Sequence, residues 1–194
     1  LKSKIKKNKK VKFIFLNKNL GVGGATLKGF NSAKKHGCDI IVKFDADNQH
    51  KISDLSKIIN TLEKKKVLFC KGFRNLRFNA SFKRKMPLIR IIGASSLTYI
   101  SRLTTKNFNL KDVTNGLFGL NSKILKIINF RSLKKNYLFE QDLIFKVSQK
   151  KIKIHQINSE VIYNDEISSL NALKSIVPFA LYHIKNFLLK FYKT

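Results

Sequence analysis

The chain has 194 residues, of which 40 are lysine or arginine and 11 are aspartate or glutamate, giving a formal charge of +29. Its hydrophobic fraction of 43% excludes a disordered chain and a protein built of several membrane spans. The charge attracts polyanions such as nucleic acid, anionic lipid headgroups or phosphorylated substrates, or it reflects compositional drift, because lysine is frequent throughout. Cys38 and Cys70 are isolated, which favours a reducing cytosol over a disulfide scaffold or a zinc site.

Strand-like patterns occur three times in the first half of the chain. Val11–Leu16, Asp39–Phe44 and Val67–Cys70 are short apolar runs typical of buried strands. Helical patterns separate them, and this alternation predicts an α/β fold with a mostly parallel sheet flanked by helices. Ligands of such folds bind at the carboxyl ends of the strands.

Two helices are expected between these strands. A glycine-rich turn at 19–25 leads into a helix that ends near His36, and Ser53 is expected to cap a helix over residues 53–64. In the first helix, a stripe of small residues at i, i+4 spacing is expected to pack closely on the sheet. The stripe consists of Ala25, Gly29 and Ala33.

The second half contains further patterns and no long linker, so a single globular unit is expected. A basic loop at 71–90 opens it. In chain order, helices are expected at about 87–103, 121–128 and 137–150, and strands at about 111–120, 152–157 and 160–163.

The last segment, residues 171–194, has apolar residues at helical spacing with lysines alongside, which predicts an amphipathic helix. Lys174, Pro178, His183 and Lys185 interrupt it, so it is not expected to span a membrane. Two alternatives stay open because both need the same periodicity. The helix lies on a membrane surface, or it docks on the core of its own domain.

The stretch DADNQH directly follows the second strand-like run. Asp45 and Asp47 repel each other there, and this repulsion requires a compensating cation, either a divalent metal or a basic side chain. Gln49 adds an oxygen in phase along an extended backbone. Alone the pattern is also compatible with a solvated turn, because two aspartates at this spacing occur by chance in many proteins.

The surrounding sequence is more specific. The segment 19–50 resembles the family 2 glycosyltransferases of the GT-A (Rossmann-like) fold, and in particular polyprenyl-phosphate sugar synthases of the dolichol-phosphate mannose synthase type. The positions that match are Asn19, Gly21, Gly23, Ala25, Gly29, Ala33, Asp45, Asp47, Gln49 and His50. Further segments match in order: KGFR at 71–74, MPLIRIIGA at 86–94, KDVTNGLFGLNSKIL at 111–125, YLFEQDL at 137–143 and EVIYNDEISSLN at 160–171.

The resemblance implies a catalytic domain over residues 1–170, followed by the amphipathic helix at 171–194. It implies a Mg²⁺ or Mn²⁺ ion, bridging the donor diphosphate, with Asp45, Asp47 and Gln49 as its ligands. The donor or its phosphates would also lie near Gly21 and Gly23, and the acceptor phosphate near Arg74 and Arg90. Asp45, Asp47 and Glu140 form the implied catalytic set, and His50 is expected to orient the metal loop.

The chain also departs from the family pattern. Ile52, Phe73 and Ser169 replace a proline, a serine and a lysine of the family, which puts the acceptor and diphosphate contacts in question. Family members begin with two strands that grip the nucleotide base and ribose, and no such segments precede the turn at 19–25. The sequence is therefore expected to be a GT-A domain truncated at its N-terminus.

The function implied is inverting transfer of a sugar, mannose or glucose, from a nucleotide diphosphate sugar to a polyprenyl or dolichyl phosphate, on the cytoplasmic face of a membrane. One alternative is transfer to a saccharide hydroxyl, which would require a base such as Asp142 or Glu140. Another is a basic polyanion-binding module. Only the stretch at 74–84 hints at it, so no nucleic-acid partner is expected.

Overall fold

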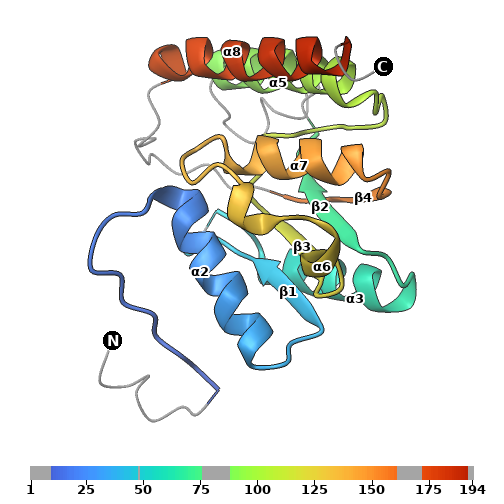
Figure 1. Ribbon diagram of the computed structural model, residues 1–194. Coiled ribbons are helices and arrows are strands. Elements are labelled where there is room, and N and C mark those ends of the chain that lie inside the picture. Colours follow the sequence, from blue (N-terminus) through green and yellow to red (C-terminus); the bar gives the residue numbers. More distant parts are fainter. Residues whose placement is uncertain (1–9, 48, 76–87, 161–171, 192–194) are drawn as a thin grey trace.

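The computed structural model describes residues 10–47, 49–75, 88–160 and 172–191 (Figure 1). Its described strands form one sheet in the order β1-β3-β2-β4. They are β1 (Ile40–Lys43), β2 (Phe69–Phe73), β3 (Phe118–Asn121) and β4 (Ile154–Asn158). β3 is antiparallel to β1 and β2, whereas β2 and β4 are parallel, so all described strands but β3 run in one direction. The predicted α/β class is confirmed, with a small mixed sheet.

Helices lie on both faces of this sheet. They are α2 (Gly21–Lys35), α3 (Ile52–Lys64), α5 (Leu88–Thr105), the short α6 (Ile124–Ile127), α7 (Phe139–Gln149) and α8 (Ala172–Phe191), with a 3₁₀ turn at Phe130–Ser132. Figure 1 shows α5 and α8 side by side, with α7 between them and the sheet. This arrangement places α7 at the centre of the molecule.

The larger core cluster joins the sheet to α2 and α7. Phe118 of β3 contacts Phe30 of α2 in an edge-to-face pair with ring centroids 6.0 Å apart, and it stacks on Phe69 of β2 at 5.6 Å. Phe139, the first residue of α7, joins the same group of rings. Aromatic pairs of this kind add stabilisation beyond the area they bury, so they fix α7 against the sheet.

The opposite face of the sheet packs on α3. Ile58 and Leu62 of α3 are fully buried there with Cys70 and Leu117. Gly119 of β3 allows this close approach, because a Cβ built on it would lie 2.4 Å from Cγ2 of Ile58. The absence of a side chain at this position therefore sets the distance between helix and sheet.

The structure corrects two predictions made from the sequence, one strand and one helix cap. The segment 11–16 is not a strand: no described strand pairs with it, and its apolar side chains are largely exposed, with Phe15 at 70%. An apolar run becomes a strand only where a neighbouring strand supplies backbone partners. Ser53 does not cap its helix, because α3 begins one residue earlier, after Lys51, which makes no capping side-chain hydrogen bond.

The packing face of α2 also differs from the prediction. Ala25 is exposed, and a Cβ on Gly29 would meet no atom within 4 Å, so the small-residue stripe does not produce a close helix–sheet contact. Phe30 is the buried residue that faces the sheet, with Ala33 only partly packed beside it. The strand expected at 111–120 is only partly right, because β3 covers 118–121 and residues 111–117 are not in a strand. The other predicted helices and strands are found within a few residues of their expected positions, except the strand at 160–163, nearly all of which lies outside the described residues.

The C-terminal helix packs on α5 and α7. Tyr182 and His183 of α8 are buried, and the Tyr182 hydroxyl donates to Oδ1 of Asp142 at 2.9 Å. The opposite side of the helix is exposed and apolar, carrying Val177, Leu181, Ile184 and Leu188. Among the described residues, no helix combines the length and apolar character needed to cross a membrane. Docking on the protein's own helices thus accounts for one face of α8 only.

Replacing Gly119 with alanine tests the packing of α3 on the sheet. Because the new methyl group would overlap Ile58, we expect Gly119→Ala to lower the free energy of unfolding by about 1–3 kcal/mol. Gly93→Ala in α5 is the matched control, since a Cβ there meets nothing within 4 Å and alanine favours the helix. Urea denaturation measures both, and an equal effect of the two changes would contradict the packing assignment.

Candidate functional site

A lysine lies between two carboxylates at the carboxyl end of β1. Lys43 ends that strand, and its Nζ donates to Oδ2 of Asp45 at 2.8 Å and to Oε1 of Glu140, in the first turn of α7, at 2.9 Å. Burial of the ammonium acts to lower the pKa of Lys43, but the two carboxylates outweigh it, so the pKa is raised. The lysine therefore joins the end of β1 to α7 through a cation that two anions share.

A second ion pair lies at the end of β2. Arg74 donates through Nε to Oδ2 of Asp112 at 2.7 Å and through Nη2 to Oδ1 at 3.2 Å, and it also donates to the hydroxyl of Thr114. Burial raises the pKa of Asp112, but the guanidinium beside it outweighs this effect and lowers the pKa to about 2. Asp112 thus holds the guanidinium in a fixed orientation.

Lys71 lies between these two pairs. Its side chain is fully buried and donates to the backbone carbonyl of Asn115. Burial lowers the pKa of Lys71, whereas the carboxylates of Glu140 and Asp112 oppose that shift. Acidic and basic side chains alternate in what we call the charged row: Asp45, Lys43, Glu140, Lys71, Asp112 and Arg74.

The metal loop predicted from sequence follows directly on β1. Asp47 is exposed, and its Oδ1 accepts the backbone N–H of Gln49 at 3.1 Å. His50 closes the loop, with Nδ1 lying 3.4 Å from Oγ of Ser159, and Ser159 donates to the buried Asp54 at 3.0 Å. Burial lowers the pKa of His50. These contacts tie the far end of the loop to the end of β4, which agrees with the loop-orienting role expected for His50.

The residue types at this loop fit a Mg²⁺ or Mn²⁺ ion. Two carboxylates and an amide oxygen are the hard ligands that these ions prefer, and so few protein ligands leave positions for phosphate oxygens. Gly116 lets the backbone come close to two carboxylates of this region. A Cβ on it would lie 2.7 Å from Oδ2 of Asp45 and 3.2 Å from Oε1 of Glu140. The described residues include no ready-made group of three or more histidine, cysteine, aspartate or glutamate ligands.

The glycines of the first motif pack against the segment that leads into α7. A Cβ on Gly21 would lie 2.7 Å from the carbonyl oxygen of Lys135, and one on Gly23 would lie 2.7 Å from Cβ of Phe139. Gly21 also has a φ of +70°, which few other residues adopt, and its N–H donates to Oδ1 of Asn19. These glycines bring the start of α2 close to Glu140. Their predicted contact with the donor stays a prediction.

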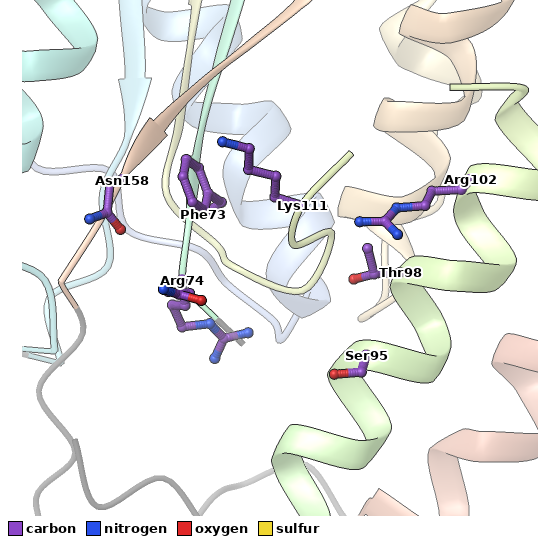
Figure 2. A pocket seen from close by; sticks show the side chains of 8 residues that line it. Phe73, Arg74, Ser95, Thr98, Arg102, Lys111 and Asn158 are labelled. Atoms are coloured by element: carbon purple, nitrogen blue, oxygen red, sulfur yellow. The ribbon is translucent and has the colours of Figure 1, made fainter. Parts of the chain in front are cut away.

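A cavity of about 620 Å³ opens beside Arg74, between the ends of β2 and β4 and helix α5 (Figure 2). Three of its lining side chains are cationic: Arg74, Arg102 and Lys111. Nε of Arg102 donates to the carbonyl oxygen of Leu110 at 2.6 Å, and Nζ of Lys111 lies 4.3 Å from the centre of the Phe73 ring. The other lining residues are Phe73, Asn75, Ser95, Thr98 and Asn158.

Sequence reasoning missed several of these residues. Lys43 and Lys71 are not among the predicted site residues, although each is a lysine next to an apolar run, and a buried lysine needs a partner. Arg102 lies outside every matching segment and Lys111 opens the segment 111–125 without being a predicted site residue, and only the fold brings the two to the cavity. Arg90, predicted to bind the acceptor, lies in the first turn of α5 and is not among the residues that line the cavity.

The sequence itself identifies the family. Residues 1–129 match glycosyl transferase family 2, which is two thirds of the chain. The chain belongs to this family. The relationship confirms the resemblance expected from the DADNQH segment and its context.

Two curated relatives carry names of sugar transfer to a polyprenyl phosphate. The chain is 29% identical, over 85% of its length, to a UDP-N-acetylglucosamine–dolichyl-phosphate N-acetylglucosaminyltransferase of Methanococcus voltae, and it covers 64% of that protein. It is 28% identical, over 66% of its length, to an undecaprenyl-phosphate mannosyltransferase of Micrococcus luteus, of which it covers 51%. The chain therefore spans less than two thirds of the length of these relatives.

Solved structures support the GT-A fold. Glucosyl-3-phosphoglycerate synthase of Mycobacterium tuberculosis matches 84% of this chain with a TM-score of 0.55 at 16% identity, and the chain covers 55% of that protein. A complex of the same enzyme with Mn²⁺, UDP-glucose and glycerol 3-phosphate matches 87% of this chain and 54% of the other, with a TM-score of 0.53 at 17% identity. At this identity the likeness concerns the fold alone.

Proposed function

We propose that this chain carries the transfer site of a metal-dependent, inverting glycosyltransferase that moves a hexose from a nucleotide diphosphate sugar to a polyprenyl or dolichyl phosphate. The observation that carries the proposal is the charged row. It ends at the predicted metal loop on one side and at the cationic cavity on the other. The names of the two curated relatives support the same donor and acceptor classes. Mannose and glucose are the sugars that the family resemblance suggests.

The donor is proposed to bind at the loop end of the row. Asp45, Asp47 and Gln49 would hold the ion, which when bound neutralises the charge that develops on the leaving diphosphate. The start of α2 at Gly21 and Gly23 lies on the same side of α7, and a helix N-terminus favours an anionic group. The Mn²⁺ complex of the mycobacterial enzyme with UDP-glucose is consistent with an ion at this type of site.

The acceptor phosphate is proposed to bind at the cavity. Arg74 is held there by Asp112, so its guanidinium is already oriented for phosphate oxygens, and Arg102 and Lys111 add positive charge around the same cavity. Arg90 is proposed to contact the acceptor on its way into the cavity, from the first turn of α5. A phosphate is anionic at neutral pH, so this chemistry needs no strong general base.

The two carboxylates that could serve a sugar hydroxyl as a base are already engaged. Glu140 is bound to Lys43, and Asp142 accepts from the Tyr182 hydroxyl and from the backbone N–H of Lys134, each at 2.9 Å. A base must be within reach of the proton that it abstracts and must have a lone pair available. Contacts to one oxygen leave lone pairs on a carboxylate, so the preference for a phosphate acceptor rests on the names of the two curated relatives. The stretch at 74–84 that suggested polyanion binding lies mostly outside the described residues.

Transfer of labelled sugar tests the proposed reaction. The protein in its full natural form, mixed with membranes, Mn²⁺ and labelled GDP- or UDP-sugars, is expected to produce label that extracts into chloroform. Because the ion requires its ligands, Asp47→Asn should lower the rate about a hundredfold or more. Asp39→Asn, which changes an exposed aspartate outside the loop, is the matched control and should keep the rate. Label in a water-soluble saccharide instead would contradict the lipid-phosphate acceptor.

We also propose that the α5–α8 pair faces the cytoplasmic surface of a membrane that holds the acceptor. Besides the exposed apolar side of α8, helix α5 exposes Leu88, Ile89, Ile92, Tyr99 and Leu103. Apolar side chains of amphipathic helices enter the headgroup region, and the formal charge of +29 attracts anionic lipids. Because α5 also lines the cavity with Ser95, Thr98 and Arg102, this orientation would bring the cavity close to a lipid phosphate.

Vesicle flotation tests this surface. Binding to vesicles of phosphatidylglycerol and phosphatidylcholine is expected to weaken about tenfold in Leu181→Glu, since an exposed leucine would no longer enter the lipid. Ile127→Glu adds the same charge on α6, which lies apart from α5 and α8 (Figure 1), and it should bind nearly as the unchanged protein does. Equal losses of vesicle binding in the two variants would contradict the proposed membrane surface, because the added charge and not its position would then weaken binding.

A further inference from the structure

A positive charge lies directly beside the predicted metal loop, at the last residue of β1. The ammonium of Lys43 is within hydrogen-bond distance of Asp45 and of Glu140, and its side chain is only 10% exposed. Asp45 is also one of the proposed ligands of the divalent ion. The same carboxylate thus has two cations competing for it, one that belongs to the chain and one that must come from solution.

The surroundings of Lys43 keep its ammonium in place. Its backbone is fixed in β1, where it pairs with Phe118 of β3. Gly116 closes the region from one side, since a Cβ there would lie 2.8 Å from Nζ of Lys43. Glu140 accepts the second hydrogen bond of the ammonium at 2.9 Å and holds it from the side of α7. The ammonium therefore stays beside Asp45.

A divalent ion on Asp45 would lie close to this ammonium, and the two like charges would repel each other. Asp45 and Asp47 together offer the ion two negative charges, and Lys43, which is shared with Glu140, offsets part of the charge of Asp45. A diphosphate brings additional negative charge to the same place. It offsets the repulsion, and its oxygens fill the open positions of the ion.

We propose that Lys43 is the resident counter-cation of the metal loop and that it makes binding of the divalent ion depend on a diphosphate group. Without diphosphate, Lys43 offsets part of the negative charge of Asp45 and Glu140, and the ion binds weakly. With diphosphate, ion and ligand bind together, so the loop is selective for the metal–diphosphate complex over the free ion. The inference rests on the proposed function, because it takes Asp45 and Asp47 as metal ligands.

Mn²⁺ binding, measured from the electron paramagnetic resonance signal of the free ion, tests this role directly. Lys43→Met removes the ammonium and is expected to bind Mn²⁺ alone about tenfold more tightly than the unchanged protein. Lys43→Arg keeps the charge and should bind Mn²⁺ as weakly as the unchanged protein. Lys123→Met, an exposed lysine outside the site, controls for the loss of one positive charge and should change the affinity less than twofold.

Pyrophosphate then tests the coupling. The unchanged protein should bind the Mn²⁺–pyrophosphate complex much more tightly than Mn²⁺ alone, and this gain should be smaller in Lys43→Met. Circular dichroism checks that each variant is folded, and Lys43→Gln, which keeps a hydrogen-bond donor, replaces Lys43→Met if that variant does not fold. The proposal is overturned if the folded, uncharged variant binds Mn²⁺ no more tightly than the unchanged protein, or if Lys123→Met tightens it equally.

The outcome is distinguishable from failure of the proposed function. If the protein transfers sugar to lipid in a metal-dependent way but loss of the Lys43 charge leaves Mn²⁺ affinity unchanged, only the counter-cation role is wrong. If Mn²⁺ affinity rises as expected and Asp45→Asn abolishes it, while no transfer occurs, the counter-cation role stands and the proposed reaction is wrong.

Discussion

The mutual neutralisation of buried charges at the carboxyl end of the sheet is the constraint on which the rest of the structure depends. Taking a charge out of water is costly unless an opposite charge lies beside it. Glu140 is paired with Lys43, and Asp112 is paired with Arg74. Removing one partner would leave the other with less compensation, so it is expected to lower the free energy of unfolding.

The row draws its members from four parts of the chain, which are the end of β1, β2 and its end, the segment before β3, and the first turn of α7. Ordinary packing brings these parts into place. β1 and β2 supply the lysines on either side of β3, and the stacked rings of Phe69, Phe118 and Phe139 fix α7 so that Glu140 reaches Lys43. Glycines allow the remaining close approaches. Gly116 lets the backbone touch the charged groups, and Gly23 lets α2 touch the segment before α7. The apolar core thus sets the geometry of a polar site.

The first turn of α7 connects this site to the C-terminal helix. Glu140 binds Lys43 on one side, while Gln141 donates to the carbonyl oxygen of Val113 and accepts from the Ser101 hydroxyl on α5. Asp142 accepts the Tyr182 hydroxyl of α8. Three consecutive residues therefore join the metal loop, α5 and α8. A surface contact made by α8 acts on the same short turn that carries Glu140, which gives the proposed membrane surface a direct structural connection to the site.

The sequence predicted the fold class and the positions of most helices and strands, because these follow from local periodicity. It also predicted that Asp45 and Asp47 lie at the end of a strand, because the segment 19–50 matches the family at many positions. It could not predict which pairs form across the chain. Lys43 and Glu140 are 97 positions apart, and only the sheet register and the packing of α7 bring them together. The segment 11–16 shows a strand that was predicted and does not form. Its apolar pattern favours a strand, but pairing with a neighbouring strand decides whether one forms. Whether Asp47, Gln49, Gly21 and Arg90 contact ligands is a question of binding, which neither pattern nor packing answers.

The central claim is that the metal loop and the cationic cavity are two ends of one site. The most direct measurement is the ³¹P resonance of farnesyl phosphate bound to the protein in the presence of pyrophosphate, recorded with Mg²⁺ and then with Mn²⁺. The account predicts that Mn²⁺ broadens the farnesyl phosphate resonance and that Asp45→Asn removes the broadening while the lipid phosphate stays bound. Bound farnesyl phosphate whose resonance Mn²⁺ leaves sharp, with Mn²⁺–pyrophosphate also bound, would place the two ligands at separate sites and contradict the account.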